Sequence, residues 1–218
     1  MLADRDSTDL HLNLARRHMR LARRYKQTAL VTAISTAIDA LKAKQDIAEE
    51  KDLERQGAYD DVYAADGDLD DGIRNLFSAA ETFDRENIGA GTVVKLFPDG
   101  GFGSIIDEPL AQEPATADAL ATKVTSLGAA HSLFPHAAKL TALAQGVRDA
   151  LTALEGAVRA SKMAEAEEEI AQAALRKQYE GNYLTGRGAV GRTIAERLFP
   201  KANRGQSEDP APAPVAPK

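Results

Sequence analysis

The chain of 218 residues contains no cysteine and no tryptophan, and aromatic residues make up only 5% of it. The absence of cysteine excludes disulfide bonds, cysteine-ligated zinc, iron–sulfur clusters and thiol catalysis. The shortage of aromatic residues disfavours an all-β sandwich. No apolar run approaches the roughly 18 residues that a membrane span needs, so we expect no transmembrane segment. The first residues also lack a basic stretch followed by an apolar one, and we expect a cytoplasmic protein.

The charge balance is mildly acidic, with 27 basic and 33 acidic residues and a net charge of −6. A protein that coats nucleic acid usually has a basic domain, so this balance argues against that role. Alanine, the best helix former, occurs 41 times. The composition therefore favours helices.

Apolar residues recur at alternating steps of three and four in several stretches, a spacing typical of coiled coils and helical bundles. The sequence predicts an all-α fold, an antiparallel bundle of long helices that is four-helix-like. Two duplicated helical hairpins are one form that such a bundle takes. The clearest series are Leu30, Ile34, Ala37 and Leu41; Leu69, Ile73, Leu76, Ala80 and Phe83; and Leu140, Ala144, Val147, Leu151, Leu154 and Val158.

Glycine and proline divide the chain into predicted segments. Gly57 and Gly67 are expected to flank a break between two helices, with a new helix starting at Asp68. The predicted segments are a leader at 1–9, a first helical hairpin at 10–98, a Gly/Pro-rich connector at 99–113, a second hairpin at 114–200 and a tail at 201–218.

Two of these segments need a closer interpretation. Residues 92–106 have enough strand propensity for a small β-hairpin, but an internal repeat favours a helix over 93–97, and we favour the helix. The tail contains Pro210, Pro212, Pro214 and Pro217, mostly alternating with alanine. We expect it to be a disordered, extended and solvated arm of polyproline type.

The internal repeat rests on two pairs of similar motifs. Asp39 to Ala43 resembles Asp149 to Ala153, and Lys95-Leu96-Phe97-Pro98 resembles Arg197-Leu198-Phe199-Pro200. The motifs lie eight residues closer together in the second copy, a difference that a loop change could absorb. Each half would then be a helix, a turn and a returning helix that ends at Leu-Phe-Pro. Chance similarity in a chain rich in alanine and leucine remains the alternative.

The most informative local feature is a run of arginines near the N-terminus, with no acidic residue between Leu10 and Ile38. At 100° per residue the five arginines fall in one sector about 120° wide. Farther along, Leu30 and Ile34 fall in that same sector, so either the helix is interrupted near 27–28 or one straight helix packs on opposite sides. The candidate site for a partner or an anion is this arginine stripe: Arg16, Arg17, Arg20, Arg23 and Arg24.

Acidic residues concentrate elsewhere. Residues 46–86 contain fourteen acidic and four basic residues, and Glu165 and Glu167 to Glu169 add a second acidic spot. These surfaces are either plain solvated helix faces or complementary patches that pair between subunits. We predict a non-catalytic structural or protein-interaction bundle that self-associates through such contacts. The alternative is binding of nucleic acid or an anionic membrane surface through the arginine stripe.

No pattern in the sequence indicates an enzyme, a cofactor or a metal site. Residues 186–191 match G-x-G-x-x-G but follow a helix-like stretch, so a kink or a close helix contact is the favoured interpretation. Residues 66–70 resemble a calcium loop with glycine out of place, which favours helix capping. His11 and His18 lie on an apolar helix face and are expected to pack rather than bind metal; His131 and His136 flank a helix start, where capping suffices.

Overall fold

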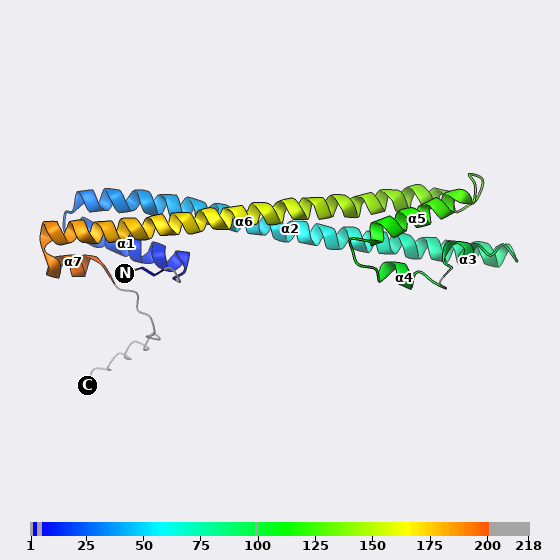
Figure 1. Ribbon diagram of the computed structural model, residues 1–218, viewed down its shortest axis with the longest axis horizontal. Helices are drawn as coiled ribbons and strands as arrows, with labels where there is room; N and C mark the ends of the chain where they lie inside the picture. Colours follow the sequence, from blue (N-terminus) through cyan, green and yellow to red (C-terminus); the bar gives the residue numbers. More distant parts are fainter. Residues whose placement is uncertain (1, 4–5, 99, 201–218) are drawn as a thin grey trace, which may run out of the picture. The chain divides into compact units, whose positions relative to one another are not determined.

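The computed structural model describes residues 2–3, 6–98 and 100–200, and over these residues it is all-α with no strand (Figure 1). This confirms the predicted fold class. The predicted tail at 201–218 lies outside the described residues. The helices are α1 (Thr8–Arg24), α2 (Thr28–Glu86), α3 (Thr92–Leu96), α4 (Gly103–Ile106), α5 (Glu113–Ser126), α6 (Phe134–Val190) and α7 (Arg192–Leu198).

The predicted break between Gly57 and Gly67 is wrong, because α2 runs without interruption for 59 residues. Neither glycine has another atom within 4 Å of the position a Cβ would take. Each costs the helix only about 1 kcal/mol, which good helix formers around it and the burial of Val62 and Leu69 outweigh. The predicted helix start at Asp68 therefore falls in the middle of α2.

The turn between α1 and α2 decides between the two alternatives left open for the arginine run. The first helix ends at Arg24, Lys26 adopts a left-handed conformation with φ of 57°, and the second helix begins at Thr28. The interrupted helix is therefore the correct alternative. Because the two helices are separate at this turn, the arginines of α1 lie on its solvent face while Leu30 of α2 is buried.

Residues 92–106 contain two short helices, α3 and α4, so the helix favoured at 93–97 is confirmed over the β-hairpin. The side chain of Asp84 accepts hydrogen bonds from the backbone N–H groups of Thr92 and Val93, each at 2.8 Å. These bonds satisfy two of the donors that the start of α3 leaves free. They also hold the pKa of Asp84 below its ordinary value, with the bond from Val93 as the first cause.

The chain forms two compact units, one of Met1–Glu50 with Lys162–Lys218 and the other of Lys51–Ser161. Unit 1 thus combines α1, the start of α2, the end of α6 and α7. Unit 2 combines the rest of α2 and α6 with α3, α4 and α5. The predicted hairpins, 10–98 and 114–200, are continuous segments, whereas unit 1 combines residues from both ends of the chain. The antiparallel arrangement of two hairpins stays a prediction.

Each unit has its own apolar core, built from short helices packed on α2 and α6. In unit 1 the short helix α1 contacts α7, and in unit 2 α5 contacts α3. The fully buried side chains of unit 1 include Leu12, Ile34, Leu41, Leu175, Tyr179 and Leu198. Those of unit 2 include Leu69, Ile73, Leu76, Leu96, Leu120 and Leu140.

The Leu-Phe-Pro half of the predicted repeat has matching surroundings in the two units. The rings of Phe77 and Phe97 meet edge to face with centroids 5.1 Å apart, and those of Tyr179 and Phe199 do the same at 5.1 Å. Tyr179 follows Phe77 by the same number of residues as Phe199 follows Phe97. The Leu-Phe pair therefore closes equivalent ends of two similar cores.

The Asp-Ala-Leu half of the repeat fails. Residues 39–43 lie in α2 and residues 149–153 lie in α6, and each helix continues unbroken for more than thirty further residues. The expected turn and short returning helix that ends at Leu-Phe-Pro are present in both halves, with the turn at 87–91 before α3 and at Gly191 before α7. The two loops differ by only four residues, so they do not absorb the eight-residue difference in spacing. Asp39 and Asp149 therefore do not occupy equivalent positions, and this pair of motifs reflects chance similarity.

Candidate functional site

Helix α1 separates a buried face from the arginine stripe. Its N-terminus is capped by Ser7, whose side chain accepts from the Leu10 N–H at 3.3 Å. The buried face consists of Thr8, His11, Leu12, Leu14, Ala15, His18 and Ala22. Within the stripe Arg16 is half-buried, whereas Arg17, Arg20, Arg23 and Arg24 are exposed. The structure thus brings the five arginines together on the solvent face, and what they bind stays a prediction.

The arginine stripe has no ion-pair partner in the part of the chain that the structure describes. None of its five guanidinium groups forms an ion pair with another described residue. Some other basic groups of unit 1 are paired, as Lys44 is with Glu167 at 2.5 Å and Lys42 with Asp46 at 2.6 Å. Five like charges on one face without counter-charges form a surface that attracts anionic groups.

The acidic residues of α2 keep a net negative surface although some of them pair locally. Arg55 bonds Asp52 at 2.7 Å, and Arg74 bonds Asp70 and Asp71 at 2.9 and 3.1 Å. Exposed pairs of this kind contribute at most about 1 kcal/mol. Several further carboxylates along the same helix are exposed: Glu49, Glu50, Glu54, Asp60, Asp61 and Asp68.

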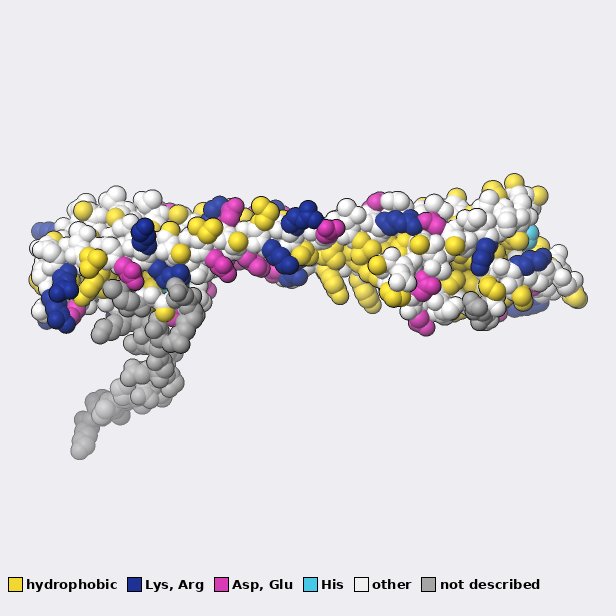
Figure 2. All heavy atoms as spheres, viewed as in Figure 1, with side chains coloured by type: hydrophobic (Ala, Val, Ile, Leu, Met, Phe, Trp, Pro, Cys, Tyr) yellow, Lys and Arg dark blue, Asp and Glu magenta, His cyan; other side chains and the backbone are white. Residues whose placement is uncertain are grey.

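Large apolar side chains are also exposed, among them Tyr59 and Tyr63 on α2, at 64% and 77%. They lie one helical turn apart in unit 2. In unit 1, Met163 and Ile170 on α6 are similarly exposed. Figure 2 shows hydrophobic side chains emerging between charged ones on the face in view. These surfaces were not predicted from the sequence, although the four-residue spacing of the tyrosines was a signal for one of them.

A buried polar network around His18 holds α7 in unit 1. The His18 Nδ1 lies 3.0 Å from the carbonyl oxygen of Leu198, and its Nε2 lies 3.1 Å from the Asn182 side-chain nitrogen. Because Asn182 donates to Nε2, the proton of the neutral ring belongs on Nδ1, which donates to Leu198. The His18 ring stacks on Phe199 at 4.0 Å. Burial lowers the pKa of His18, which favours this neutral form.

His11 and His18 pack in the interior, as the sequence predicted. His11 and His18 are both fully buried, and His131 caps the chain before α6 by accepting from the Leu133 N–H at 3.2 Å. Among the described residues, no three histidine or acidic side chains are grouped so as to hold a metal ion.

The stretch 66–70 lies inside α2, so the helix cap expected there is wrong. Its two outer carboxylates, Asp66 and Asp70, instead face Glu113 at the start of α5. Glu113 is only 1% exposed, and its Oε1 has no hydrogen-bond partner. Burial first, and the two neighbouring carboxylates second, raise the pKa of Glu113 to about 8. This cluster was not predicted from the sequence, because its members are brought together only by tertiary packing.

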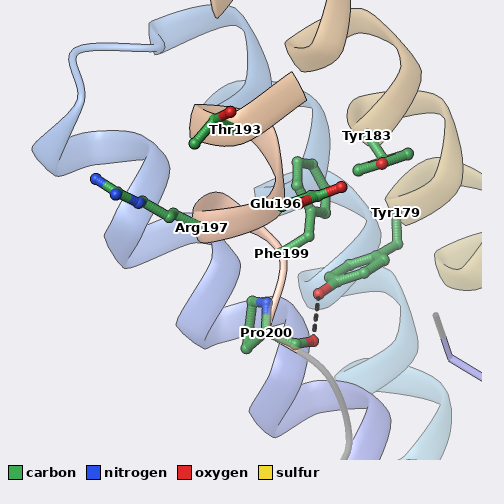
Figure 3. A pocket seen from close by; sticks show the side chains of 7 residues that line it. All are labelled: Tyr179, Tyr183, Thr193, Glu196, Arg197, Phe199 and Pro200. Carbon is green, nitrogen blue, oxygen red and sulfur yellow. Dashed lines mark hydrogen bonds between the residues drawn. The ribbon is translucent and has the colours of Figure 1, made fainter. Parts of the chain in front are cut away.

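A groove of about 560 Å³ lies where α7 meets α6 in unit 1 (Figure 3). Its walls are Tyr179, Tyr183, Thr193, Glu196, Arg197, Phe199 and Pro200. The Tyr179 hydroxyl donates to the Pro200 carbonyl at 3.2 Å, and the Tyr183 and Phe199 rings meet edge to face at 5.3 Å. The Arg197 side chain extends away from the rings in Figure 3. The groove thus combines aromatic side chains with one acidic and one basic residue, Glu196 and Arg197.

The glycine motif at 186–191 lies at the end of α6 and has no preceding strand. Gly186 is packed closely, with Leu30 Cδ1 and Phe199 Cε2 at 3.4 and 3.6 Å from the position of a Cβ, and Gly191 has a positive φ of 79°. The favoured interpretation of a close helix contact is therefore confirmed.

Comparison with known proteins supplies no family, because no family pattern, curated protein or solved structure matches the chain. Across the described residues, none of the helices combines the length and apolar character needed to cross a membrane.

Proposed function

We propose that this protein is a non-catalytic, structural or interaction module that self-associates through its charged helix faces. The observation that supports it is the arginine stripe, which lies on the solvent face of α1 without ion pairs to the described residues. A cationic face on a chain of net charge −6 has its complement on other copies of the same chain, along the acidic face of α2.

Exposed apolar residues add to this argument. Charge complementarity steers association and sets its orientation, but apolar burial supplies most of the affinity. Tyr59 and Tyr63 lie on the helix that also carries the acidic face, so a partner that docks there would cover both kinds of surface. Tyrosine is enriched in the centres of protein interfaces for this reason.

Binding of nucleic acid or an anionic membrane surface through the same stripe is the second candidate. The observation that favours it is that the five arginines are close enough on one helix face to follow a line of phosphates. The overall acidity of the chain favours a protein partner over this alternative, because an extended polyanion would also meet the acidic face of α2.

The test is light scattering coupled to size exclusion at low and high salt. We expect the native chain to show a mass above 23.3 kDa at low salt and a lower mean mass near 1 M salt, where the Debye length is about 3 Å and the charge contacts are screened. Replacing Arg17, Arg20 and Arg24 by glutamate should give the monomer mass at every salt concentration.

The matched control reverses three exposed basic residues elsewhere, Lys139, Lys162 and Arg187, which changes the net charge equally. It should associate as the native chain does. A monomer at both salt concentrations, or equal loss of association in the two triple variants, would contradict the proposal. Retention on DNA or acidic vesicles that depends steeply on salt and on the arginines would favour the second candidate.

A further inference from the structure

Helix α5 covers only part of one side of α2 in unit 2. Residues that recur at alternating steps of four and three share this side: Asp52, Gln56, Tyr59, Tyr63, Asp66 and Asp70. Glu113, the first residue of α5, faces Asp66 and Asp70, which are half-buried. From there α5 runs toward α3, where Lys123 donates to the Leu96 carbonyl at 3.4 Å. The side of α2 before Asp66 is therefore not covered by α5.

This uncovered stretch carries two aromatic rings among acidic residues. Tyr59 and Tyr63 are 64% and 77% exposed. Asp60, between them in the sequence, is exposed and forms no ion pair with a described residue. Arg55 is the one basic residue from 52 to 63, and it already bonds Asp52 at 2.7 Å. We call the following residues the tyrosine face: Asp52, Gln56, Tyr59, Asp60 and Tyr63.

We propose that the tyrosine face of one copy of the chain binds the arginine stripe of a second copy. This inference rests on the self-association proposed above and names the surface that receives the stripe. Tyrosine rings beside carboxylates suit arginine, because the planar guanidinium stacks on aromatic rings and forms paired hydrogen bonds with carboxylates. The arginine stripe has no ion-pair partner among the described residues, so its charges are available for this contact.

The spacing of the side chains agrees with this pairing. Tyr59 and Tyr63 lie one helical turn apart on α2, and Arg20 and Arg24 have the same four-residue spacing on α1. Two guanidinium groups of α1 can therefore meet two rings of α2 when the helices pack side by side. Tyrosine and arginine are also among the residues that most often dominate the binding energy of protein interfaces.

An exchange of charges between the two surfaces tests the pairing in the full chain. The stripe-reversed chain is the triple glutamate variant of the arginine stripe, and the face-reversed chain carries Tyr59→Arg, Asp60→Arg and Tyr63→Arg. By light scattering at low salt, we expect each variant alone to have the monomer mass. An equimolar mixture should associate, because each arginine surface then meets an acidic one. A single chain with both sets of substitutions should associate as the native chain does.

The matched control carries Leu53→Arg, Asp61→Arg and Ala64→Arg, at exposed positions on another side of α2, and it changes the net charge by the same amount. It should associate as the native chain does. If the control loses association as the face-reversed chain does, or if the mixture stays monomeric, the inference is overturned.

The same measurements separate this inference from the proposed self-association. If the stripe-reversed chain is monomeric while the face-reversed chain associates as the native chain does, self-association stands and the tyrosine face is the wrong partner surface. A native chain that is monomeric at low salt would overturn both.

A second measurement isolates the rings from the charges. In a dilution series, replacing both Tyr59 and Tyr63 by alanine should raise the dissociation constant about tenfold, whereas replacing both by phenylalanine should change it by less than about twofold, because phenylalanine keeps the ring. Equal dissociation constants for the alanine and phenylalanine variants would overturn the assignment of the rings to this contact.

Discussion

The buried carboxyl of Glu113 makes the stability of unit 2 depend on pH in an unusual direction. Its pKa is about 8 in the folded chain, against 4.5 as the ordinary value. Between these values the folded state keeps the proton that the unfolded state has lost, so stability falls as the pH rises and levels off above pH 8. At about 1.4 kcal/mol per pKa unit, the free energy of unfolding should fall by about 4 kcal/mol between pH 5 and pH 9.

Glu113→Gln tests this reasoning because glutamine keeps the shape and still donates a hydrogen bond toward Asp66 and Asp70. The assay is urea unfolding followed by far-ultraviolet circular dichroism at pH 5 and pH 9. We expect the variant to gain about 4 kcal/mol relative to the native chain over that pH range. Glu81→Gln, an exposed change in the same unit, is the control and should gain nothing.

The reasoning would be refuted if the stability difference between Glu113→Gln and the native chain were the same at pH 5 and pH 9. That result would mean that Glu113 is ionised in the fold at both values. The ionised group would then need a counter-charge, but Arg74 already bonds Asp70 and Asp71, and Arg148 already bonds Asp118. Comparing two variants at each pH removes the contribution of all other titrating groups, because they are common to the chains.

Two further predictions concern other parts of the fold. Burial lowers the pKa of His18, so as the pH falls below about 6.5 the unfolded chain binds a proton at this residue before the folded chain does. The native chain should therefore lose stability relative to His18→Gln between pH 7.5 and pH 5, as measured by urea unfolding. A stability difference between the two chains that does not change with pH would contradict this prediction. Gly67→Ala should stabilise α2 by about 0.5–1 kcal/mol, whereas in Gly72→Ala the new Cβ would lie 2.6 Å from Leu143 Cδ1. In thermal unfolding, Gly67→Ala should therefore have a higher midpoint than Gly72→Ala. The reverse order would contradict the close packing at Gly72.

The features that sequence alone predicted are those with a local cause. The three-and-four spacing of Leu69, Ile73 and Leu76 identifies a buried helix face, and all three side chains are fully buried. The stripe on α1 follows from the same geometry, since the residues opposite a buried face must point outward. Glycine as a helix breaker was overrated at Gly57 and Gly67, because good helix formers around them and the burial of Val62 and Leu69 outweigh a local penalty.

Features that depend on distant parts of the chain were not predictable. The cluster at Glu113 needs α5 to lie against α2, and nothing in the sequence near Asp66 or Asp70 indicates that contact. The groove beside Tyr179 likewise exists only because α7 folds back onto α6. By contrast, the Leu-Phe-Pro repeat did indicate a tertiary feature, because the same short sequence closes an equivalent end of each unit.

The equivalence of the two Leu-Phe-Pro ends allows the helices that pack on them, α1 and α5, to be compared. Helices α1 and α5 have the same structural task, since each precedes a long helix and packs against the short helix that ends in Leu-Phe-Pro. Yet α5 has Lys123 as its only basic residue, alongside Glu113 and Asp118. A basic outer face is therefore not needed to place such a helix on its unit. The five arginines of α1 add a property that packing does not require, and this supports our proposal that they contact a partner.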